Sequence, residues 1–599
     1  MIQTISAETI YREQLHDLNS KLATYKKKQN LFGWLRLSLF IISAVIAFSL
    51  FTFSITGGVV SIVLTIISFI ILVSVDADNN KEIINTRNLI LINEEELLIL
   101  KDEYSNRYDG SSYAPSVHDY ANDLDIFGPS SVFQYINRCS SEQGRALLAN
   151  NFLIPLDKKE ILERHEAIKE LAPMHQWRHQ LASYLLKTPV TVKSQERIES
   201  WIDDPDEMFI HKAWDWIVPV YSIISVSIGL ATIFGFISIT VFSLFFILFF
   251  LVSGNFSRKA SKTYSLLNGV AKEIDTIQEI VAWAENKEFK ASLLLQLQQS
   301  VKSNEKTASF QIKQLKDILN RFDIRLNWLA FIFLNSFLLW DVRQVRALNS
   351  WKHKNRYKVR GWFYFIGQFE VLHSLATLFF NNPQWSWPLF ENYFQLKGKA
   401  IGHPLIPVSK RVTSDFSLKG SPKIAIITGS NMAGKSTFLR SLGVNVLLAQ
   451  MGAPVCCESF CLSQMRLLSS MRIEDNLAES TSTFYAELKK LKTIVDAVNR
   501  HEPVFILLDE ILRGTNSLDR HQGSKALIRQ MIRKRGVAVL ATHDVELAKM
   551  EELFTDGIEN YHFDVQVKGE ELYFDYLLKK GVCTNLNATI LMKKIGIEL

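Results

Sequence analysis

Two long stretches of the chain contain no charged residue. The first runs from Leu37 to Val75 and the second from Trp216 to Ser257. Gly57-Gly58 divides the first into two apolar segments of about 17–18 residues, and a hydrocarbon core of roughly 30 Å needs helices of about that length. The second stretch is also long enough for two passes, with Gly235 as the expected turn. The pattern predicts two transmembrane helical hairpins, 31–76 and 214–257.

Basic residues flank both hairpins, whereas the short loops inside them carry no charge. These flanking residues are Lys26–Lys28, Arg36, Lys81, Arg87, Lys212, Arg258, Lys259 and Lys262. By the positive-inside rule, both hairpins enter and leave from the cytoplasmic side. The alternative is two pairs of helices buried in a large soluble core. A shorter apolar stretch, Trp328 to Trp340, ends before it could span a membrane, and we interpret it as a buried helix.

Outside the hairpins the hydrophobic spacing is helical as far as residue 380, and then it changes. The segment that begins at Lys158 and the segment from Arg258 to Arg325 repeat apolar residues every three or four positions, which is typical of long amphipathic helices. From Lys423, the segments KIAIIT, VFILLDE and VAVLATH are buried strands separated by helical stretches. This alternation predicts a mostly parallel sheet covered on both faces.

These patterns divide the chain into seven expected parts. They are a polar cytoplasmic helix (1–30), the first hairpin (31–76), a linker or helix (77–119), core and lever helices (120–213), the second hairpin (214–257), further lever helices and the end of the core (258–395), and an α/β domain (396–599).

Composition adds little to this division. The 599 residues are 48% hydrophobic with a net charge of +6, which is compatible with contact with nucleic acid or anionic lipid but demands neither. The five cysteines are odd in number and form no CxxC pair, so we expect free thiols and no zinc site.

The clearest chemical motif lies between the first strand and its helix. It reads Gly429-x-x-x-x-Gly434-Lys435-Ser436-Thr437, the spacing of a P-loop in its proper strand-to-helix context. The glycines let backbone N–H groups turn toward phosphates, and the helix N-terminus adds its positive dipole end. Lys435 is expected to reach the β- and γ-phosphates and the Ser436 hydroxyl to ligate Mg²⁺. ATP and Mg²⁺ are therefore the predicted cofactors.

Acidic and imidazole side chains follow the other two strands. VFILLDE ends with Asp509 and Glu510, and VAVLATH ends with His543. We expect Asp509 to hold the Mg²⁺ shell and Glu510 to polarise the attacking water. His543 reaches the same sheet edge, where it is expected to contact the γ-phosphate, although a lone histidine is more often structural. The predicted catalytic residues are Glu510, His543 and Lys435.

These motifs resemble the MutS family of ABC-related ATPases. TGSNMAGKSTFLRSLGVNVLLAQMG is similar to the family's P-loop and following helix, STFYAEL to its STFxxE segment, LLDEILRGTNSLD to LLDExxRGTS, and ATHDVEL to ATHxxEL. Upstream, GHP at Gly402, the segment FGPSSVFQYINRCSSEQGRALLANNFLIP, ILERHEAIKEL and FEVLHSLATL resemble parts of the family's core and lever helices. The resemblance covers roughly residues 120–599.

The resemblance implies a dimer in which each nucleotide is closed by the partner subunit. It assigns the γ-phosphate to Asn431 in cis and to Ser482 in trans, and it places 513–516 at the dimer interface. A simple helix N-cap is the alternative for Ser482. The implied nucleotide-binding residues are Gly429, Ser430, Asn431, Met432, Ala433, Gly434, Lys435, Ser436, Thr437 and Ser482 in trans, with Ser436 and Asp509 as Mg²⁺ ligands.

The chain also departs from the family pattern. Ser430 and Ala433 stand where the family usually has Pro and Gly, and nothing before residue 120 resembles the mismatch-reading domain with its Phe-x-Glu wedge. The second hairpin occupies part of the space of the family's DNA clamp. Mismatch recognition therefore does not carry over with the resemblance.

The expected protein is a membrane-anchored, MutS-like ATPase homodimer whose ATP cycle opens and closes helical arms on DNA. We expect it in the bacterial inner membrane, with the ATPase domain in the cytoplasm. The alternative is a membrane mechanochemical or scaffold ATPase acting on a protein or lipid partner without DNA. An ABC transporter is disfavoured because the LSGGQ motif is absent and two separated hairpins make a poor pore.

Overall fold

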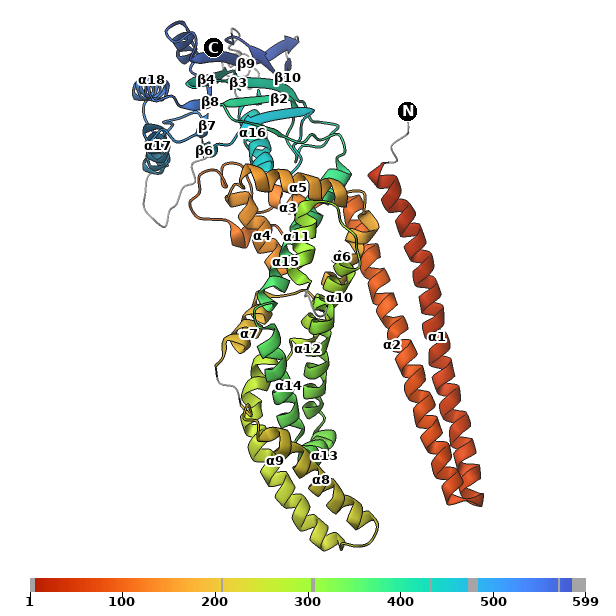
Figure 1. Ribbon diagram of the computed structural model, residues 1–599. Coiled ribbons are helices and arrows are strands. Elements are labelled where there is room, and N and C mark those ends of the chain that lie inside the picture. The colour runs from red at the N-terminus through yellow and green to blue at the C-terminus, as the bar shows by residue number, and fades with distance from the viewer. Residues whose placement is uncertain are drawn as a thin grey trace. The chain divides into compact units, whose positions relative to one another are not determined.

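The computed structural model describes residues 6–205, 208–302, 307–430, 433–471, 483–568 and 571–583. Its residues form two compact units (Figure 1). The first comprises Met1–Leu97, Cys139–Arg145 and Met174–Glu370, and the second comprises Leu98–Arg138, Ala146–Pro173 and Val371–Leu599. The first unit is helical and the second carries the sheets, so the chain combines an all-helical N-terminal region with a C-terminal α/β domain. The seven expected parts remain a prediction.

Helices α1 (Ala7–Phe53) and α2 (Ile55–Ile99) contain the first uncharged stretch. The polar residues up to position 30 continue into the apolar segment as one helix. The turn expected at Gly57-Gly58 is wrong by three residues. The chain reverses at Ser54, whose backbone is extended and whose hydroxyl accepts a hydrogen bond from the Gly57 amide at 3.3 Å. This cap starts α2 before the glycines, so they lie inside its first turn.

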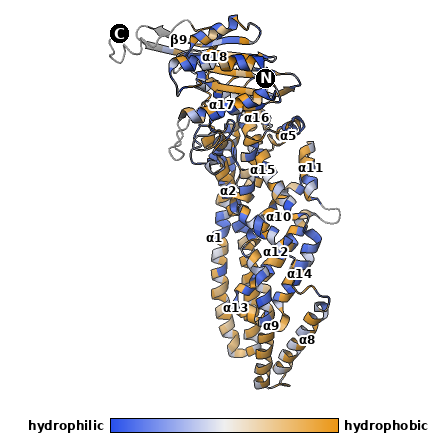
Figure 2. Ribbon diagram, turned by 90° about the vertical axis from the view of Figure 1, so that its left-hand side faces the viewer, coloured by the Kyte–Doolittle hydropathy of each residue, from blue (hydrophilic) through white to orange (hydrophobic). Residues whose placement is uncertain are grey.

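The second uncharged stretch forms α8 (Trp214–Ile233) and α9 (Ile239–Leu267), with the expected turn at Gly235, where φ is +80°. By length and composition, five helices of the described residues could cross a membrane. Four of them, α1, α2, α8 and α9, expose most of their apolar residues, and Figure 2 shows long hydrophobic segments on them. The fifth, α15 (Val359–Asn381), is mostly buried and belongs to the protein interior.

Helix α13 (Trp328–Leu338) is not the buried helix that the sequence suggested. Trp328 is 68% exposed, Leu329 51% and Phe333 55%. The helix packs against α8 and α9 by one side only, and its buried residues are Asn335 and Ser336. An apolar helix that packs against its neighbours by one side leaves the rest of its circumference uncovered, which explains the exposed face.

The remaining helices belong to both units. They are α3 (Val132–Ile136), α4 (Glu142–Leu153), α5 (Lys158–Leu171), α6 (His175–Lys187), α7 (Val192–Asp203), α10 (Ala271–Glu285), α11 (Ser292–Val301), α12 (Ala308–Phe322) and α14 (Trp340–Asn355). In the first unit, α10 packs along α12 through fully buried Ile274, Ile277, Ile312 and Leu315. The expected long amphipathic helices are thus present, but in shorter pieces.

The α/β domain is built on a six-stranded sheet with the order β10-β9-β4-β8-β7-β6. Its strands are β4 (Lys423–Thr428), β6 (Arg466–Ser470), β7 (Val504–Asp509), β8 (Val537–Thr542), β9 (Ile558–Lys568) and β10 (Glu571–Lys580). All neighbours are parallel except β9 and β10. The three strands expected from the sequence are β4, β7 and β8, so that prediction is confirmed.

Both faces of this sheet are covered, as predicted. Helices α17 (Thr483–Asn499) and α18 (Ser517–Arg533) share one buried cluster with Ile506 and Leu508 of β7. Helix α16 (Lys435–Gln450) packs on the opposite face, where Gly443 comes so close to Leu507 that an added Cβ would lie 2.8 Å from it. Side chains alternate along β7, so Ile506 and Leu508 face the layer of α17 and α18, and Leu507 faces α16.

A second, four-stranded sheet was not anticipated. Its order is β1-β5-β2-β3, with β1 (Leu389–Glu391), β2 (Gln395–Ile401), β3 (Ser414–Lys419) and β5 (Ser459–Ser463). Short strands with polar alternation, such as SDFSLK, give a weak sequence signal compared with the buried runs of the main sheet.

Candidate functional site

The loop between β4 and α16 has the backbone that its glycines predict. Gly429 has φ +148°, and a Cβ there would lie 2.8 Å from the Phe563 carbonyl oxygen. Gly434 has φ +106° and precedes the first residue of α16. Both positions disfavour a side chain because their backbone conformation is one that L-residues rarely adopt. At Gly429 the close approach to β9 also leaves no room for a side chain. The loop thus brings the α16 N-terminus, with its positive dipole end, to the edge of the sheet.

Lys435 is folded back over this loop. Its Nζ donates to the carbonyl oxygens of Gly429 at 2.8 Å and Ser430 at 2.9 Å, and the residue is buried. Burial lowers the pKa of the ammonium group, while the nearby carboxylates of Glu510 and Asp509 oppose that shift. The ammonium group also lies 3.4 Å from both ring nitrogens of His543. A buried cation held by carbonyls and an imidazole, with carboxylates nearby, is well placed to receive an anionic ligand.

The sheet order brings the acidic residues to the same edge. Because β8 lies between β4 and β7, the ends of all three strands are neighbours. Asp509 is buried, and its Oδ1 has no hydrogen-bond partner. An unpaired buried carboxylate oxygen needs a cation or a donor, which fits an Mg²⁺ ligand.

Glu510 follows in a left-handed backbone conformation with φ +49°. Its Oε1 lies 2.5 Å from Nε2 of His543, and its Oε2 lies 3.2 Å from Nε of Arg513. The hydrogen bond with His543 is the main reason why the pKa of Glu510 lies below its ordinary value. Glu510 is therefore ionised at neutral pH, as a group that accepts a proton from water must be.

The structure brings together most of the residues expected at the site. Besides those above, Ser436 and Thr437 are exposed on the first turn of α16, Ala433 is buried, and the buried Ser430 hydroxyl has no partner. Asn431, Met432 and Ser482 lie outside the described residues. The predicted roles of all these residues remain predictions.

Glu487 also belongs to this region, although its role was not predicted from the sequence. It is buried on α17, and its carboxylate accepts hydrogen bonds from the backbone amides of Leu512 and of Arg513, the latter at 3.2 Å. It thereby fixes the loop that directly follows Glu510. The available signal was the glutamate of STFYAEL, which sequence reasoning used only as a family marker.

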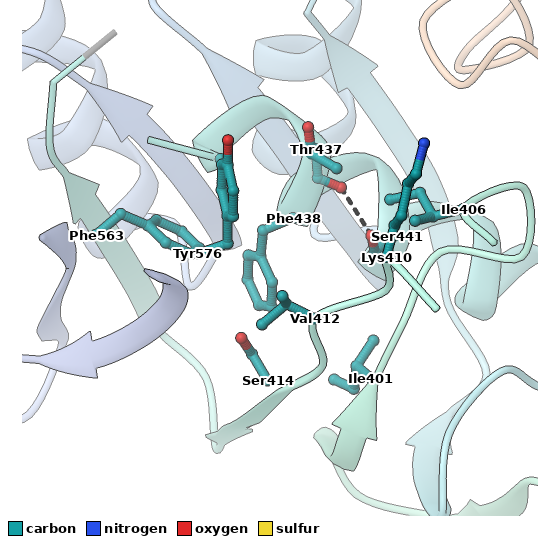
Figure 3. A pocket seen from close by; sticks show the side chains of 11 residues that line it. Ile401, Ile406, Lys410, Val412, Ser414, Thr437, Phe438, Ser441, Phe563 and Tyr576 are labelled. Carbon is teal, nitrogen blue, oxygen red and sulfur yellow. Dashed lines mark hydrogen bonds between the residues drawn. The ribbon is translucent and has the colours of Figure 1, made fainter. Parts of the chain in front are cut away.

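A cavity of about 240 Å³ lies beside the P-loop (Figure 3). The rings of Phe438, Phe563 and Tyr576 lie on one side of it, and Phe438 and Phe563 are 6.0 Å apart. Val412 closes another side, and Thr437 lies at its edge. The sequence did not reveal this cavity, because its walls come from the second sheet and from β9 and β10, far apart in the chain.

A parallel sheet with a P-loop, a buried lysine and acidic residues at one edge defines a P-loop nucleotide-binding domain. Comparison with known proteins gives the family. Residues 425–595 match the model of MutS domain V, a P-loop ATPase domain. These residues therefore form a domain of the MutS domain V family.

Several relatives of the domain are mismatch repair proteins. The chain is 33% identical over 220 residues to the DNA mismatch repair protein MutS of Aquifex pyrophilus, covering 36% of this chain and 25% of the relative. It is 36% identical over 239 residues to MutS of Acetivibrio thermocellus, covering 39% and 27%. The chain thus spans about a quarter of the length of these relatives.

Proposed function

We propose that the chain binds ATP with Mg²⁺ and hydrolyses it at the edge of the main sheet. The observation that carries this proposal is the convergence of Lys435, Asp509 and the Glu510–His543 pair within one parallel sheet edge. Lys435 would exchange its carbonyl contacts for the β- and γ-phosphates. Ser436 and Asp509 would hold Mg²⁺, which neutralises phosphate charge when bound. Glu510 accepts the proton of the attacking water, and His543 orients Glu510.

The adenine base is proposed to enter the cavity beside the P-loop. The cavity is adjacent to Gly434 and Thr437, so a nucleotide whose phosphates lie on the α16 N-terminus has its base within reach. Three aromatic rings offer stacking surfaces for a planar base. Replacing Tyr576 by alanine should weaken ATP binding. The rate at which bound ATP releases inorganic phosphate should stay nearly unchanged.

Equilibrium binding separates the phosphate contact from catalysis. Lys435→Met should lose affinity for MgATP by about 30- to 150-fold, because it removes a charge-assisted contact of about 2–3 kcal/mol. Glu510→Gln should bind MgATP like the wild type. If Lys435→Met bound MgATP normally, the nucleotide would lie elsewhere.

We further propose that two chains form a composite site, with Ser482 of one chain reaching the nucleotide of the other. Support comes from the match of residues 425–595 to MutS domain V and from the resemblance of STFYAEL, which begins at Ser482, to the family's STFxxE segment. Stable dimers should appear by light scattering when MgATP is added to Glu510→Gln, since that variant is expected to retain the nucleotide. A monomer under those conditions would contradict the composite site.

Membrane anchoring by α1, α2, α8 and α9 is also a proposal. It is supported by their exposed apolar faces, by their length and by the basic residues at the ends of both hairpins. The protein would then reside in the inner membrane with the ATPase domain in the cytoplasm. Membranes washed with alkaline carbonate should retain the chain; its release would contradict anchoring.

DNA is the proposed cargo of the helical arms, because the relatives of the ATPase domain are mismatch repair proteins by name. The second candidate, a membrane mechanochemical ATPase acting on a protein or lipid, is favoured by the exposed apolar helices. A salt titration of DNA binding by the detergent-solubilised protein distinguishes them. A steep loss of affinity with salt, with a midpoint that ATP shifts, supports DNA, whereas no binding at low salt excludes it.

A further inference from the structure

The exposed helix α13 lies along the apolar hairpin formed by α8 and α9. The Phe337 ring lies 5.9 Å from Phe246 and 6.4 Å from Phe242, which is three residues from the start of α9. Ser225 of α8 donates a hydrogen bond to the Phe337 carbonyl at 2.7 Å. The end of α13 therefore reaches residues well inside the uncharged stretch.

Charged and polar groups gather where that stretch ends. Ser257 donates a hydrogen bond to the buried Asp341 carboxylate at 2.5 Å. Arg325 lies 3.8 Å from the same carboxylate and donates to the Ser261 hydroxyl at 2.9 Å, while its Nη1 is buried without a hydrogen-bond partner. The negative charge of Asp341 is thus offset by Arg325.

A cavity of about 230 Å³ lies between α9 and α13. Its wall is polar at Ser257, Arg258 and Ser261 and apolar at Phe250, Phe331 and Ile332. On α9, Arg258 follows Phe250 by eight residues, or about 12 Å along the helix axis. Arg258 is also the first charged residue after the uncharged stretch. The cavity therefore has Arg258 and Ser261 at one end and Phe250 at the other. Phe331 lies at the charged end, where its ring is 5.8 Å from the Arg325 guanidinium.

One buried group of this wall lacks a partner. Ser336 is fully buried, lines the cavity, and its hydroxyl forms no hydrogen bond. Buried hydroxyls are normally satisfied, and leaving one unpaired costs about 1–3 kcal/mol. The polar side chains beside the cavity are thus not fully paired within the described residues.

We propose that this cavity binds a phospholipid with an anionic head group. Arg258 and the serine hydroxyls contact the phosphate, and an acyl chain runs along Phe250 and Phe331. The apolar half of the wall favours a lipid over a free anion, and the charge of Arg258 favours an anionic over a zwitterionic head group. The proposal rests on the membrane anchoring of α8 and α9.

Native mass spectrometry of the full chain in detergent tests it, with phosphatidylglycerol or phosphatidylcholine of identical acyl chains as the added probe. Arg258→Gln removes the charge of the wall. Gly254→Leu fills the cavity, because Gly254 lines it and an added Cβ meets no atom within 4 Å. Lys259→Gln is the matched control, since this exposed neighbour on α9 carries the same charge but does not line the cavity.

The wild type and Lys259→Gln should retain phosphatidylglycerol in preference to phosphatidylcholine. Arg258→Gln should reduce that preference about fivefold, the effect of one basic side chain next to an anionic lipid, and Gly254→Leu should reduce retention of both lipids. Equal losses in Arg258→Gln and Lys259→Gln would mean general charge attraction and would overturn the site. Displacement of the lipid by millimolar inorganic phosphate would show a free-anion site instead and would also overturn it.

The carbonate wash of membranes keeps the two proposals separate. If the chain is released by the wash, the anchoring proposal itself fails. If the chain stays in the membrane but all variants bind both lipids alike, only the lipid site fails.

Discussion

Replacing Glu487 by alanine removes the acceptor that two backbone amides use in the loop after β7. The carboxylate is buried, and it accepts from Leu512 and Arg513, two and three residues beyond Glu510. A hydrogen bond to a charged acceptor contributes about 1.5–3 kcal/mol. Losing both removes about 3–6 kcal/mol of loop stabilisation, which is enough to free a segment that holds Glu510 in a left-handed conformation.

The consequence should appear in turnover and not in binding. Misplacing a catalytic group by about 1 Å costs on the order of 10²-fold in rate, whereas the P-loop, Lys435 and Asp509 do not contact Glu487 in the described structure. We therefore expect kcat for ATP hydrolysis to fall about 100-fold in Glu487→Ala, with the Kd for MgATP changed less than threefold. Glu487→Gln keeps one acceptor oxygen and should fall between the wild type and alanine.

Single-turnover hydrolysis gives the rate of the chemical step, and equilibrium binding to the same protein gives the Kd for MgATP. A wild-type rate in Glu487→Ala would refute the positioning role. A rate that falls only together with MgATP affinity would show instead that the variant disrupts the whole domain.

Three further perturbations follow from the same geometry. Gly429→Ala should weaken MgATP binding tenfold or more by fluorescence titration, since its Cβ would lie 2.8 Å from a carbonyl of β9 and its φ of +148° disfavours a side chain. Asp123→Asn should destabilise β6 by about 2 kcal/mol, read by hydrogen exchange. This buried carboxylate accepts a hydrogen bond from the Ser469 hydroxyl of β6 at 2.6 Å and pairs at 3.0 Å with Lys490 of α17, which is itself one-third exposed. His543→Ala should raise the pKa of Glu510 toward its usual range, since the lost hydrogen bond is the main cause of its depression. As pH falls, Glu510 would then become protonated at a higher pH than in the wild type. The acid limb of the pH–rate profile for ATP hydrolysis should therefore shift to higher pH. An unshifted acid limb would contradict the pairing of Glu510 with His543.

The main sheet and its chemistry were predictable because their signals are local. The spacing from Gly429 to Thr437 specifies a loop, and a buried run that ends in Asp509 specifies where a parallel strand stops. Since carboxyl ends of parallel strands meet at one edge, the site follows from three short segments.

Features that depend on distant segments were not predictable. The hairpin turn was expected at Gly57 because glycine breaks helices, but a serine cap three residues earlier decides it. Helix α13 was expected to be buried because its apolar stretch ends before it could span a membrane, yet its exposure depends on which side of it the neighbouring helices cover. The cavity at Phe563 and Tyr576 and the tether of Glu487 join segments that have no common sequence pattern.

The most direct test of the proposed function is ATP hydrolysis by the purified full chain in nanodiscs, with Mg²⁺ and with EDTA, for the wild type and Glu510→Gln. The account predicts Mg²⁺-dependent phosphate release by the wild type and a loss of at least 10²-fold in Glu510→Gln, with MgATP still bound. Phosphate release by Glu510→Gln at the wild-type rate would contradict it.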